Sequence, residues 1–470
     1  MRIGIIGHNS VEYIETLFSI WNSGHSAVLI DSEAPPSAII NFFEECNVER
    51  CYIEESLCLR YENPPPFDLI TYPIKYKMPC ILPASVRTMY SERRDESEAV
   101  IIFSSGTTGK CKGISLSHRV LYNNSDSIME YMNPQSTDCL YLNKKLSHSS
   151  SLVGELLVAL RSGTDILISS LFIPPRLSFE YISDFGVTIL CCNPILLGMF
   201  ADEAERTGNF PECVRVIYTS GDTVSEKAIE RARNLFNCPV YNAYGQTECG
   251  PRISVQRVYC QSGNSVGKPI RDVSVKLDDC GEILVKTNAL FSGYTGLNTI
   301  PEEWHRTGDV GYIGTDGELY VIGRVDNMIV IGAHNIYPEV IEKTIVDNTD
   351  VYDCMIYKFG DVLACDYVAP QRMDIEIVRV VRSLLIPYEI PKKYRRVDRI
   401  SRNSNGKKQR VAEEKAYVEK RLEANKYGEK SAVYMRNSSI VGSKILLSKR
   451  YCCIFILFIR LSVIRCLSAL

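Results

Sequence analysis

The sequence lacks the charge excess that nucleic-acid-binding proteins show. Its 53 basic and 56 acidic side chains give a net charge of −3, and no stripe of lysine and arginine is interleaved with aromatic residues. The sequence also lacks the cysteine spacing of a structural zinc site, because its 18 cysteines include no C-x-x-C pair. The apolar run at the N-terminus is too short for a secretory signal. We therefore expect no nucleic-acid partner, no structural zinc, and a cytoplasmic protein whose cysteines are mostly buried, reduced thiols.

The length and the composition are those of a globular protein with more than one domain. A chain of 470 residues is too long for a single ordinary core, so two or three domains are expected. Apolar residues make up 45% and charged residues 23% of the chain, the balance of a soluble globular protein.

Apolar runs of strand length alternate with amphipathic segments through the first two-thirds of the chain. This alternation predicts an α/β fold in which helices cover the sheets. The expected strands include 3–6, 26–30, 100–103, 165–169, 187–191 and 214–219, and the expected helices include 10–23, 153–161 and 225–236. From about residue 263 the pattern changes to short strands and turns, which indicates a β-rich subdomain. Beyond Asp326 a smaller α+β part is predicted, with helices at 338–347 and 374–385 and strands at 351–357 and 361–368.

The last segment, from about residue 427, is apolar but carries arginines. Arg460 and Arg465 lie inside "YCCIFILFIRLSVIRCLSAL", and each would cost roughly 2.5 to 3.5 kcal/mol near a bilayer centre. We expect a disordered end or a reading-frame or gene-boundary artefact here, and an interfacial or membrane anchor is the alternative. Residues 425–470 are therefore treated as a tail of uncertain status.

The stretch "IIFSSGTTGKCKG", residues 101–113, joins an apolar run to a loop rich in glycine, hydroxyl groups and lysine. Glycines let main-chain N–H groups approach a phosphate closely, so the loop points to a nucleotide. The phosphate-loop pattern G-x-x-x-x-G-K-[ST] does not fit, because Cys111 follows Lys110. Taken alone, a turn between two strands is the other interpretation.

Four later segments complete a set with this loop. They are "YNAYGQTE" (241–248), "HRTGDVGYI" (305–313), "GRVDNMIVIGAHNIYPEVIE" (323–342) and "NGKKQR" (405–410). In order and approximate spacing, the five segments resemble the core motifs of the adenylate-forming superfamily, which comprises acyl- and aryl-CoA synthetases, luciferases and nonribosomal peptide adenylation domains. The resemblance covers about residues 1–412. It implies a large AMP-binding domain at 1–325 and a small mobile C-terminal domain at 326–424 that carries a catalytic lysine. Family members usually begin with a helix and a strand before the stretch equivalent to residues 2–18. These have no counterpart here, so a damaged or non-catalytic product is a further expectation.

The resemblance assigns the glycine-rich loop to the β- and γ-phosphates of ATP. Cys111 stands where the family usually has proline. Thr107 and Glu248 would be the ligands of Mg²⁺. The phosphate-binding set is Ser104, Ser105, Gly106, Thr107, Thr108, Gly109 and the cation Lys112.

The nucleoside would be held by the next two motifs. By the resemblance, Tyr244 stacks on the adenine beside Gly245, Thr247 contacts the α-phosphate, and Asp309 accepts hydrogen bonds from the ribose with the help of Arg324. The adenine-binding turn would comprise Ser220, Gly221 and Asp222, although the family more often has glycine in place of Asp222.

The C-terminal motifs imply two half-reactions. Lys407 would bridge the substrate carboxylate and the α-phosphate, and the pattern G-K-x-x-R favours it over the adjacent Lys408. Asp326 matches a hinge about which the small domain turns, and Gly332 matches a glycine that lines the thiol tunnel. The pattern M-I-x-x-G-x-x-N-I-x-P resembles the corresponding motif of acyl- and aryl-CoA synthetases more than that of peptide adenylation domains.

The chemistry of carboxylate activation explains why the motifs contain cationic, hydroxyl and acidic residues. A carboxylate is a poor electrophile and repels a triphosphate, so its activation requires neutralised charge and in-line placement at the α-phosphate. The predicted function is an ATP- and Mg²⁺-dependent ligase that joins a small-molecule carboxylic acid to CoA through an acyl-AMP. An enzyme that loads the pantetheine of a separate carrier protein is the first alternative, and a nucleotide-binding protein without catalysis is the second.

Overall fold

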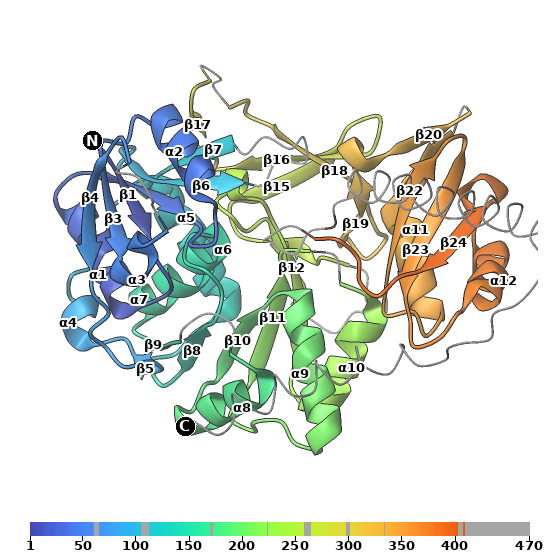
Figure 1. The fold of residues 1–470 in the computed structure, drawn as a ribbon, viewed down its shortest axis with the longest axis horizontal. Helices are drawn as coiled ribbons and strands as arrows, with labels where there is room; N and C mark the ends of the chain where they lie inside the picture. The colour runs from blue at the N-terminus through green and yellow to red at the C-terminus, as the bar shows by residue number, and fades with distance from the viewer. Residues whose placement is uncertain are drawn as a thin grey trace, which may run out of the picture. The chain divides into compact units, whose positions relative to one another are not determined.

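The computed structural model describes residues 1–60, 65–104, 112–169, 173–222, 224–257, 265–297, 301–332, 334–402 and 408. These residues belong to one compact unit, Met1–Arg410 (Figure 1). Within the described ranges, no helix has both the length and the apolar character that crossing a membrane requires.

The first sheet has seven strands in the order β17-β7-β6-β2-β1-β3-β4. The strands β1, β2, β3, β4 and β6 pair in parallel. At one side of the sheet, β7 pairs antiparallel with β6, and β17 pairs antiparallel with β7. The sequences of β1, β2 and β6 are near-continuous apolar runs, as expected for central strands that are covered on both faces. The bounds are β1 (Arg2–Ile6), β2 (Ser26–Ile30), β3 (Arg50–Glu54), β4 (Asp68–Tyr72), β6 (Glu98–Ser104), β7 (Lys112–Ser117) and β17 (Gly293–Tyr294).

Helices join these strands. Helix α1 begins after Ser10, whose hydroxyl accepts a hydrogen bond from the backbone N–H of Tyr13 and so caps the helix. The helices are α1 (Val11–Asn22), α2 (Pro36–Glu45), α3 (Glu55–Cys58), α4 (Ala84–Arg87) and α5 (His118–Met132).

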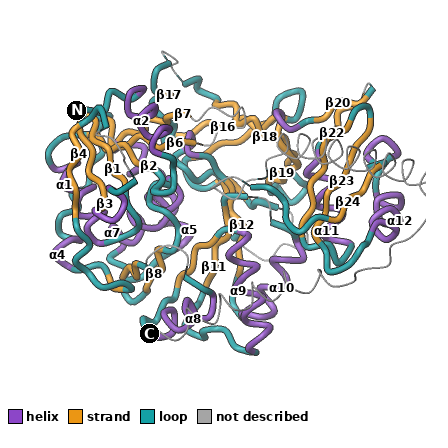
Figure 2. The backbone as a smooth tube through the Cα atoms, in the orientation of Figure 1, coloured by secondary structure: helices purple, strands orange, loops and turns teal. Residues whose placement is uncertain are grey.

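The second sheet has eight strands in the order β14-β13-β12-β11-β10-β8-β9-β5. The five strands from β12 to β9 in this order are parallel, and the outer strands are antiparallel. Helices α9 and α10 lie beside β10 to β12 (Figure 2). The strands are β5 (Cys80–Ile81), β8 (Cys139–Leu142), β9 (Asp165–Ile168), β10 (Ile189–Cys192), β11 (Val216–Ser220), β12 (Val240–Tyr244), β13 (Ser254–Val255) and β14 (Lys268–Pro269), and the helices are α8 (Pro175–Asp184), α9 (Pro194–Thr207) and α10 (Glu226–Phe236).

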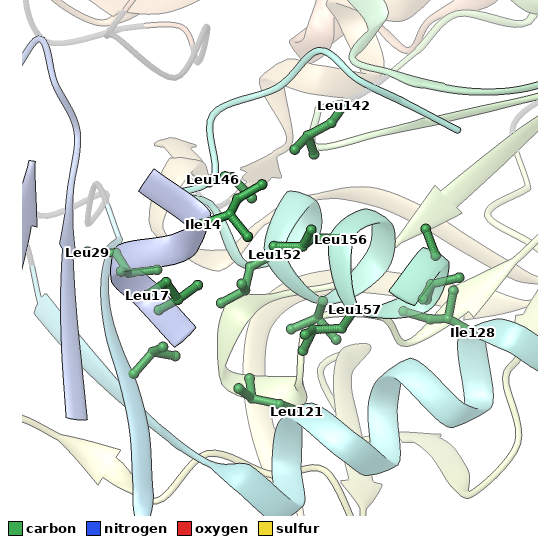
Figure 3. Close-up of a cluster of buried hydrophobic side chains, with 14 of the residues drawn as sticks. Ile14, Leu17, Leu29, Leu121, Ile128, Leu142, Leu146, Leu152, Leu156 and Leu157 are labelled. Atoms are coloured by element: carbon green, nitrogen blue, oxygen red, sulfur yellow. The ribbon is translucent and has the colours of Figure 1, made fainter. Parts of the chain in front are cut away.

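The main core joins the two sheets through helices that are apolar on their facing sides. Side chains of α1, α5 and the helical stretch at 149–162 meet in one buried cluster (Figure 3). Ile14, Leu17, Leu121, Leu152 and Leu156 are each at most 3% exposed. Burial of one such side chain stabilises the fold by about 1.5 to 3 kcal/mol relative to leaving it exposed.

The helix predicted at 153–161 differs from the observed one. A short α6 (Ser149–Ser151) leads into a π-helical turn, η1 (Leu152–Leu157), and only then into α7 (Val158–Ser162). A π-helical turn bonds residue i to residue i+5 and is found frequently at functional sites. All six residues of η1 are buried, so the widened turn lies inside the protein.

The remainder of the described chain is richer in β structure. One four-stranded antiparallel sheet comprises β15 (Val273–Leu277), β16 (Glu282–Thr287), β18 (His305–Ile313) and β19 (Leu319–Arg324), with hairpin turns around residues 278–281 and 314–318. The later elements are β20 (Ile329–Ile331), β21 (His334–Ile336), α11 (Pro338–Asn348), β22 (Asp353–Phe359), β23 (Val362–Val368), α12 (Asp374–Leu384) and β24 (Lys393–Arg396), with the 3₁₀ turns η2 (Thr247–Cys249), η3 (Val325–Asn327) and η4 (Pro387–Glu389). These later elements surround a core of their own, formed around Ile341, Ile356 and Tyr367. The predicted α/β fold class with a β-rich part and an α+β part is confirmed.

The cysteines that the structure describes are unpaired and mostly buried. Nine are buried, three are half-buried and Cys280 is exposed. Burial raises the pKa of the Cys139 and Cys191 thiols to about 12. For the described cysteines, the expectation of buried, unpaired thiols is confirmed.

Candidate nucleotide and acid site

Two neighbouring parallel strands bring the "TSGD" turn beside the "AYGQTE" segment. Ser220 at the end of β11 is in register with Ala243 of β12, and Tyr244 is the last residue of β12. Gly221 follows with φ +102°, a conformation that glycine adopts without strain. Ligands of α/β sheets bind beyond the carboxyl ends of parallel strands, which is where Ser220, Gly221, Asp222 and Tyr244 lie.

Asp309 is the centre of a hydrogen-bonded group. Its Oδ2 accepts hydrogen bonds from the Tyr244 hydroxyl at 2.6 Å and from Gln246 Nε2 at 2.9 Å, and its Oδ1 accepts one from Arg324 Nη1 at 3.0 Å. Arg324 is the direct cross-strand partner of Asp309 in the β18–β19 hairpin. Burial and the Asp309 carboxylate raise the pKa of Tyr244 well above its usual value, so Tyr244 stays a neutral donor. Three separate motifs thus meet at one carboxylate that is 6% exposed.

Glu248 and Thr247 each have a partner from another part of the chain. The hydroxyl of Tyr294 on β17 donates a hydrogen bond to Glu248 Oε1 at 3.0 Å. The ring of Tyr294 also lies beneath Lys112, whose Nζ is 5.0 Å from the ring centroid. The hydroxyls of Thr247 and Ser149 are hydrogen-bonded at 2.8 Å. The strand that follows the glycine-rich loop therefore lies next to the Y-G-x-T-E segment.

The glycine-rich loop itself lies outside the described residues. This holds for Ser105, Gly106, Thr107, Thr108 and Gly109, and Ser104 is described by its backbone alone. Ser104 and Lys112 pair across β6 and β7, so the loop begins and ends at adjacent strand positions. The predicted phosphate contacts remain predictions.

Lys407 also lies outside the described residues, but its neighbour Lys408 has a defined place. The Lys408 ammonium is 2.9 Å from Glu342 and 3.1 Å from Asp353, and it donates to the carbonyl of Cys354 at 2.5 Å. Its pKa is raised, against the effect of burial, by Glu342 and Asp353. Lys408 is thus engaged in contacts within the protein, and the role of Lys407 stays a prediction.

The two remaining predicted residues lie further along the chain. Asp326 is exposed in η3, two residues beyond Arg324. Gly332 follows β20 in the turn toward β21, with φ +63°. Among the described residues, no contact joins Gly332 to the Asp309 group.

Gln246, Tyr294 and Ser149 are site residues that the sequence does not single out. Gln246 lies inside the Y-G-x-T-E motif at its variable position, so its contact with Asp309 has no sequence signal. Tyr294 and Ser149 contact the motif from segments 46 and 98 residues away. Such contacts follow from the fold and not from local pattern.

The close approach at Gly245 leads to a prediction. A Cβ built on this residue would be 1.9 Å from the backbone oxygen of Pro251. We expect Gly245→Ala to displace the backbone, weaken ATP binding about tenfold or more, and lower the free energy of unfolding by about 1 to 3 kcal/mol. Titration with a non-hydrolysable ATP analogue and denaturant unfolding measure the two effects.

Gly198→Ala is the matched control. Gly198 lies within α9, and a Cβ there meets no atom within 4 Å. Alanine in a helix interior is favoured over glycine by about 0.5 to 1 kcal/mol, so this variant should bind the analogue normally and unfold no more easily. Equal ATP affinity in both variants would contradict the assignment of Gly245 to the site.

Comparison with known proteins agrees with this geometry. The sequence pattern of the family described as "AMP-binding enzyme" matches residues 1–295. The chain is 23% identical to the 2-succinylbenzoate–CoA ligase of Lactococcus lactis over 418 residues, covering 86% of this chain and 88% of the relative. It is also 23% identical to the fatty acid–[acyl-carrier-protein] ligase ScoC of Streptomyces coeruleorubidus, covering 86% and 85% of the two chains.

Solved structures share the fold. The anthranilate CoA ligase AuaEII in complex with anthranoyl-AMP superposes with a TM-score of 0.77 at 18% identity, covering 88% of this chain and 87% of that chain. The o-succinylbenzoate CoA synthetase of Bacillus subtilis in complex with ATP and magnesium gives 0.75 at 22% identity, covering 87% and 88%. The resemblance inferred from the five motifs is confirmed, and the chain belongs to the AMP-binding enzyme family.

Proposed function

We propose that this protein is an ATP-dependent ligase that joins a carboxylic acid to CoA through an acyl-AMP. A carboxylate oxygen attacks the α-phosphorus of ATP, the bond to the β-phosphate breaks, and pyrophosphate leaves. The CoA thiol then loses its proton and attacks the acyl carbon, and AMP leaves with the electron pair of the anhydride bond. The named relatives and the membership of the family support this reaction.

The observation that carries the proposal is the group around Asp309. A carboxylate held by Arg324, Tyr244 and Gln246 is fixed in place at the carboxyl ends of two parallel strands. Fixed acceptors of this kind suit the hydroxyls of a ribose, and the adjacent Thr247 and Glu248 suit the phosphate end of the same nucleotide.

Glu248 fits the coordination of Mg²⁺. Magnesium is usually held by one or two carboxylates together with substrate phosphates, so it needs no cage of protein ligands. Glu248 would hold the ion with Thr107, and the ion would neutralise phosphate charge when bound.

The remaining roles belong to the same proposal. The loop from Ser104 to Gly109, with Lys112, would hold the β- and γ-phosphates. Lys407 would neutralise charge between the carboxylate and the α-phosphate. Asp326 would be the hinge by which Gly332 replaces Lys407 at the site for the thiol step. The unpaired, buried cysteines support a cytoplasmic location.

The test is exchange of labelled pyrophosphate into ATP, measured with Mg²⁺ across fatty, aryl and amino acids that include 2-succinylbenzoate and anthranilate. We expect exchange that depends on one class of acid, and thioester product only when CoA is added. Product that forms only with an acyl carrier protein would move the assignment to carrier loading, which the relative ScoC represents. ATP binding without exchange for any acid would overturn the proposal.

A further inference from the structure

A chain of ion pairs joins the candidate adenine turn to the segment that carries Lys407. The Nη1 atom of Arg402 is 3.3 Å from Asp222 Oδ2, and its Nη2 atom is 2.6 Å from Asp353 Oδ2. The ammonium of Lys408 is 3.1 Å from the other carboxylate oxygen of Asp353. Negative and positive groups therefore alternate from the turn to the residue that follows Lys407.

Arg402 and Lys408 are also paired through their backbones. The two residues form an antiparallel bridge, so the segment between them, 403–407, begins and ends at one place. Both side chains are half-buried, and both contact the carboxylate of Asp353. A guanidinium with a carboxylate on each of two sides is fixed in orientation, because its N–H donors form a rigid planar fork. The two ends of the Lys407 segment are therefore held by the same group of charges.

Asp222 connects this group of charges to the second sheet. It lies two residues beyond β11, whereas Asp353 begins β22 in the later elements, which have a core of their own. A second contact links the same two parts of the chain. The ammonium of Lys227, on α10, donates a hydrogen bond to the carbonyl of Thr349 at the end of α11, at 3.2 Å. The later elements are thus tied to the second sheet at two points that lie five residues apart in the sequence.

We propose that Asp222 is a positioning residue that, through Arg402, holds Lys407 near the nucleotide for acyl-AMP formation. This inference rests on the proposed function, since it concerns the first step of that reaction. Arg402 precedes Lys407 by five residues, which span at most about 18 Å when fully extended. An anchor for Arg402 at the adenine turn therefore confines the lysine to the neighbourhood of the nucleotide. The thioester step, which does not use Lys407, gains nothing from this contact.

The first experiment compares the two half-reactions in Asp222→Ala. Pyrophosphate exchange measures acyl-AMP formation, and release of AMP from synthetic acyl-AMP with CoA measures thioester formation. Because ion pairs near the surface contribute little, we expect the ratio of the first rate to the second to fall about 2- to 5-fold. Salt screens such charges, so the difference from the wild type should shrink at about 1 M salt, where the Debye length is about 3 Å. Asp222→Glu keeps the charge and should restore most of the ratio.

Two further variants test the partner and the specificity of the effect. When Arg402→Gln is already present, adding Asp222→Ala should change the ratio little further, because the contact between the two side chains has been removed. Asp202→Ala is the matched control. Its carboxylate is 2.8 Å from Arg231, in an ion pair between α9 and α10 that does not involve the later elements. This control should leave the ratio of the two rates unchanged.

Hydrogen exchange separates this inference from the proposed function, because it needs no turnover. Peptides that cover the end of α11 should exchange faster in Asp222→Ala than in the wild type, since one of two ties has been removed. Equal hydrogen exchange in the two proteins would reject the anchoring contact. An active wild type whose ratio survives Asp222→Ala, or a variant that loses ATP affinity with the ratio intact, would overturn this inference while the ligase stands. Faster hydrogen exchange together with a wild type that shows no pyrophosphate exchange would keep the contact and reject the ligase.

Discussion

Lys407→Ala should lower the rate of acyl-AMP formation about 10²- to 10³-fold and leave thioester formation from supplied acyl-AMP nearly unchanged. The reason is that an ammonium placed where negative charge develops acts in the transition state of one step alone. Pyrophosphate exchange measures the first step, and release of AMP from synthetic acyl-AMP with CoA measures the second. Equal loss of both steps would reject the role assigned to Lys407.

The adjacent lysine provides the control. Lys408 is in contact with Glu342 and Asp353, and Glu342 is 5% exposed. Removal of one partner from a buried ion pair costs roughly 3 to 5 kcal/mol, because the remaining charge stays buried. We therefore expect Lys408→Ala to lower the unfolding midpoint, whereas Lys407→Ala unfolds like the wild type. If the two variants exchanged these effects, the register of the "NGKKQR" motif would be shifted by one residue.

Asp309→Ala should weaken ATP binding about 100-fold. The substitution removes a charged acceptor, and hydrogen bonds to charged groups contribute about 1.5 to 3 kcal/mol each. It also releases Tyr244, Gln246 and Arg324 from their common partner. Fluorescence titration with a labelled ATP analogue, together with the KM for ATP, measures the effect.

A second carboxylate of the same β18–β19 hairpin serves as its control. Asp316 is exposed in the turn, where it accepts a hydrogen bond from Tyr320 at 2.8 Å. Asp316→Ala removes the same charge and should leave ATP affinity unchanged, because Asp316 is exposed and its hydrogen-bond partner Tyr320 belongs to the same hairpin. A similar loss of affinity in both variants would show that net charge, and not the Asp309 group, governs ATP binding.

Local pattern predicts the strands and helices of the first sheet well. Strand β2 is an uninterrupted apolar run, and α1 begins at a serine cap, so both signals lie within a few residues of the element they specify. The π-helical turn is different, because apolar residues at 152, 153, 156 and 157 suit an α-helix equally well. Nothing local distinguishes a turn widened by one residue.

The contacts of the candidate site also differ in how far the sequence predicts them. Asp309 and Arg324 were predictable because they lie in short motifs that the family shares. The contact of Tyr294 with Glu248 was not predictable, since 46 residues separate the two along the chain. Only the folded arrangement, in which β17 pairs with β7, brings the two side chains together.

The burial of the cysteines has a practical consequence for following the reaction. A thiol reacts with disulfide dyes as the thiolate, so buried thiols with raised pKa values react slowly. Among the described cysteines, Cys280 is the exposed one, so it should give most of the protein signal from that part of the chain. Consumption of free CoA can then be read directly by its thiol colour in the presence of the folded enzyme. A Cys280→Ser variant would lower the background further and make each turnover visible as lost absorbance.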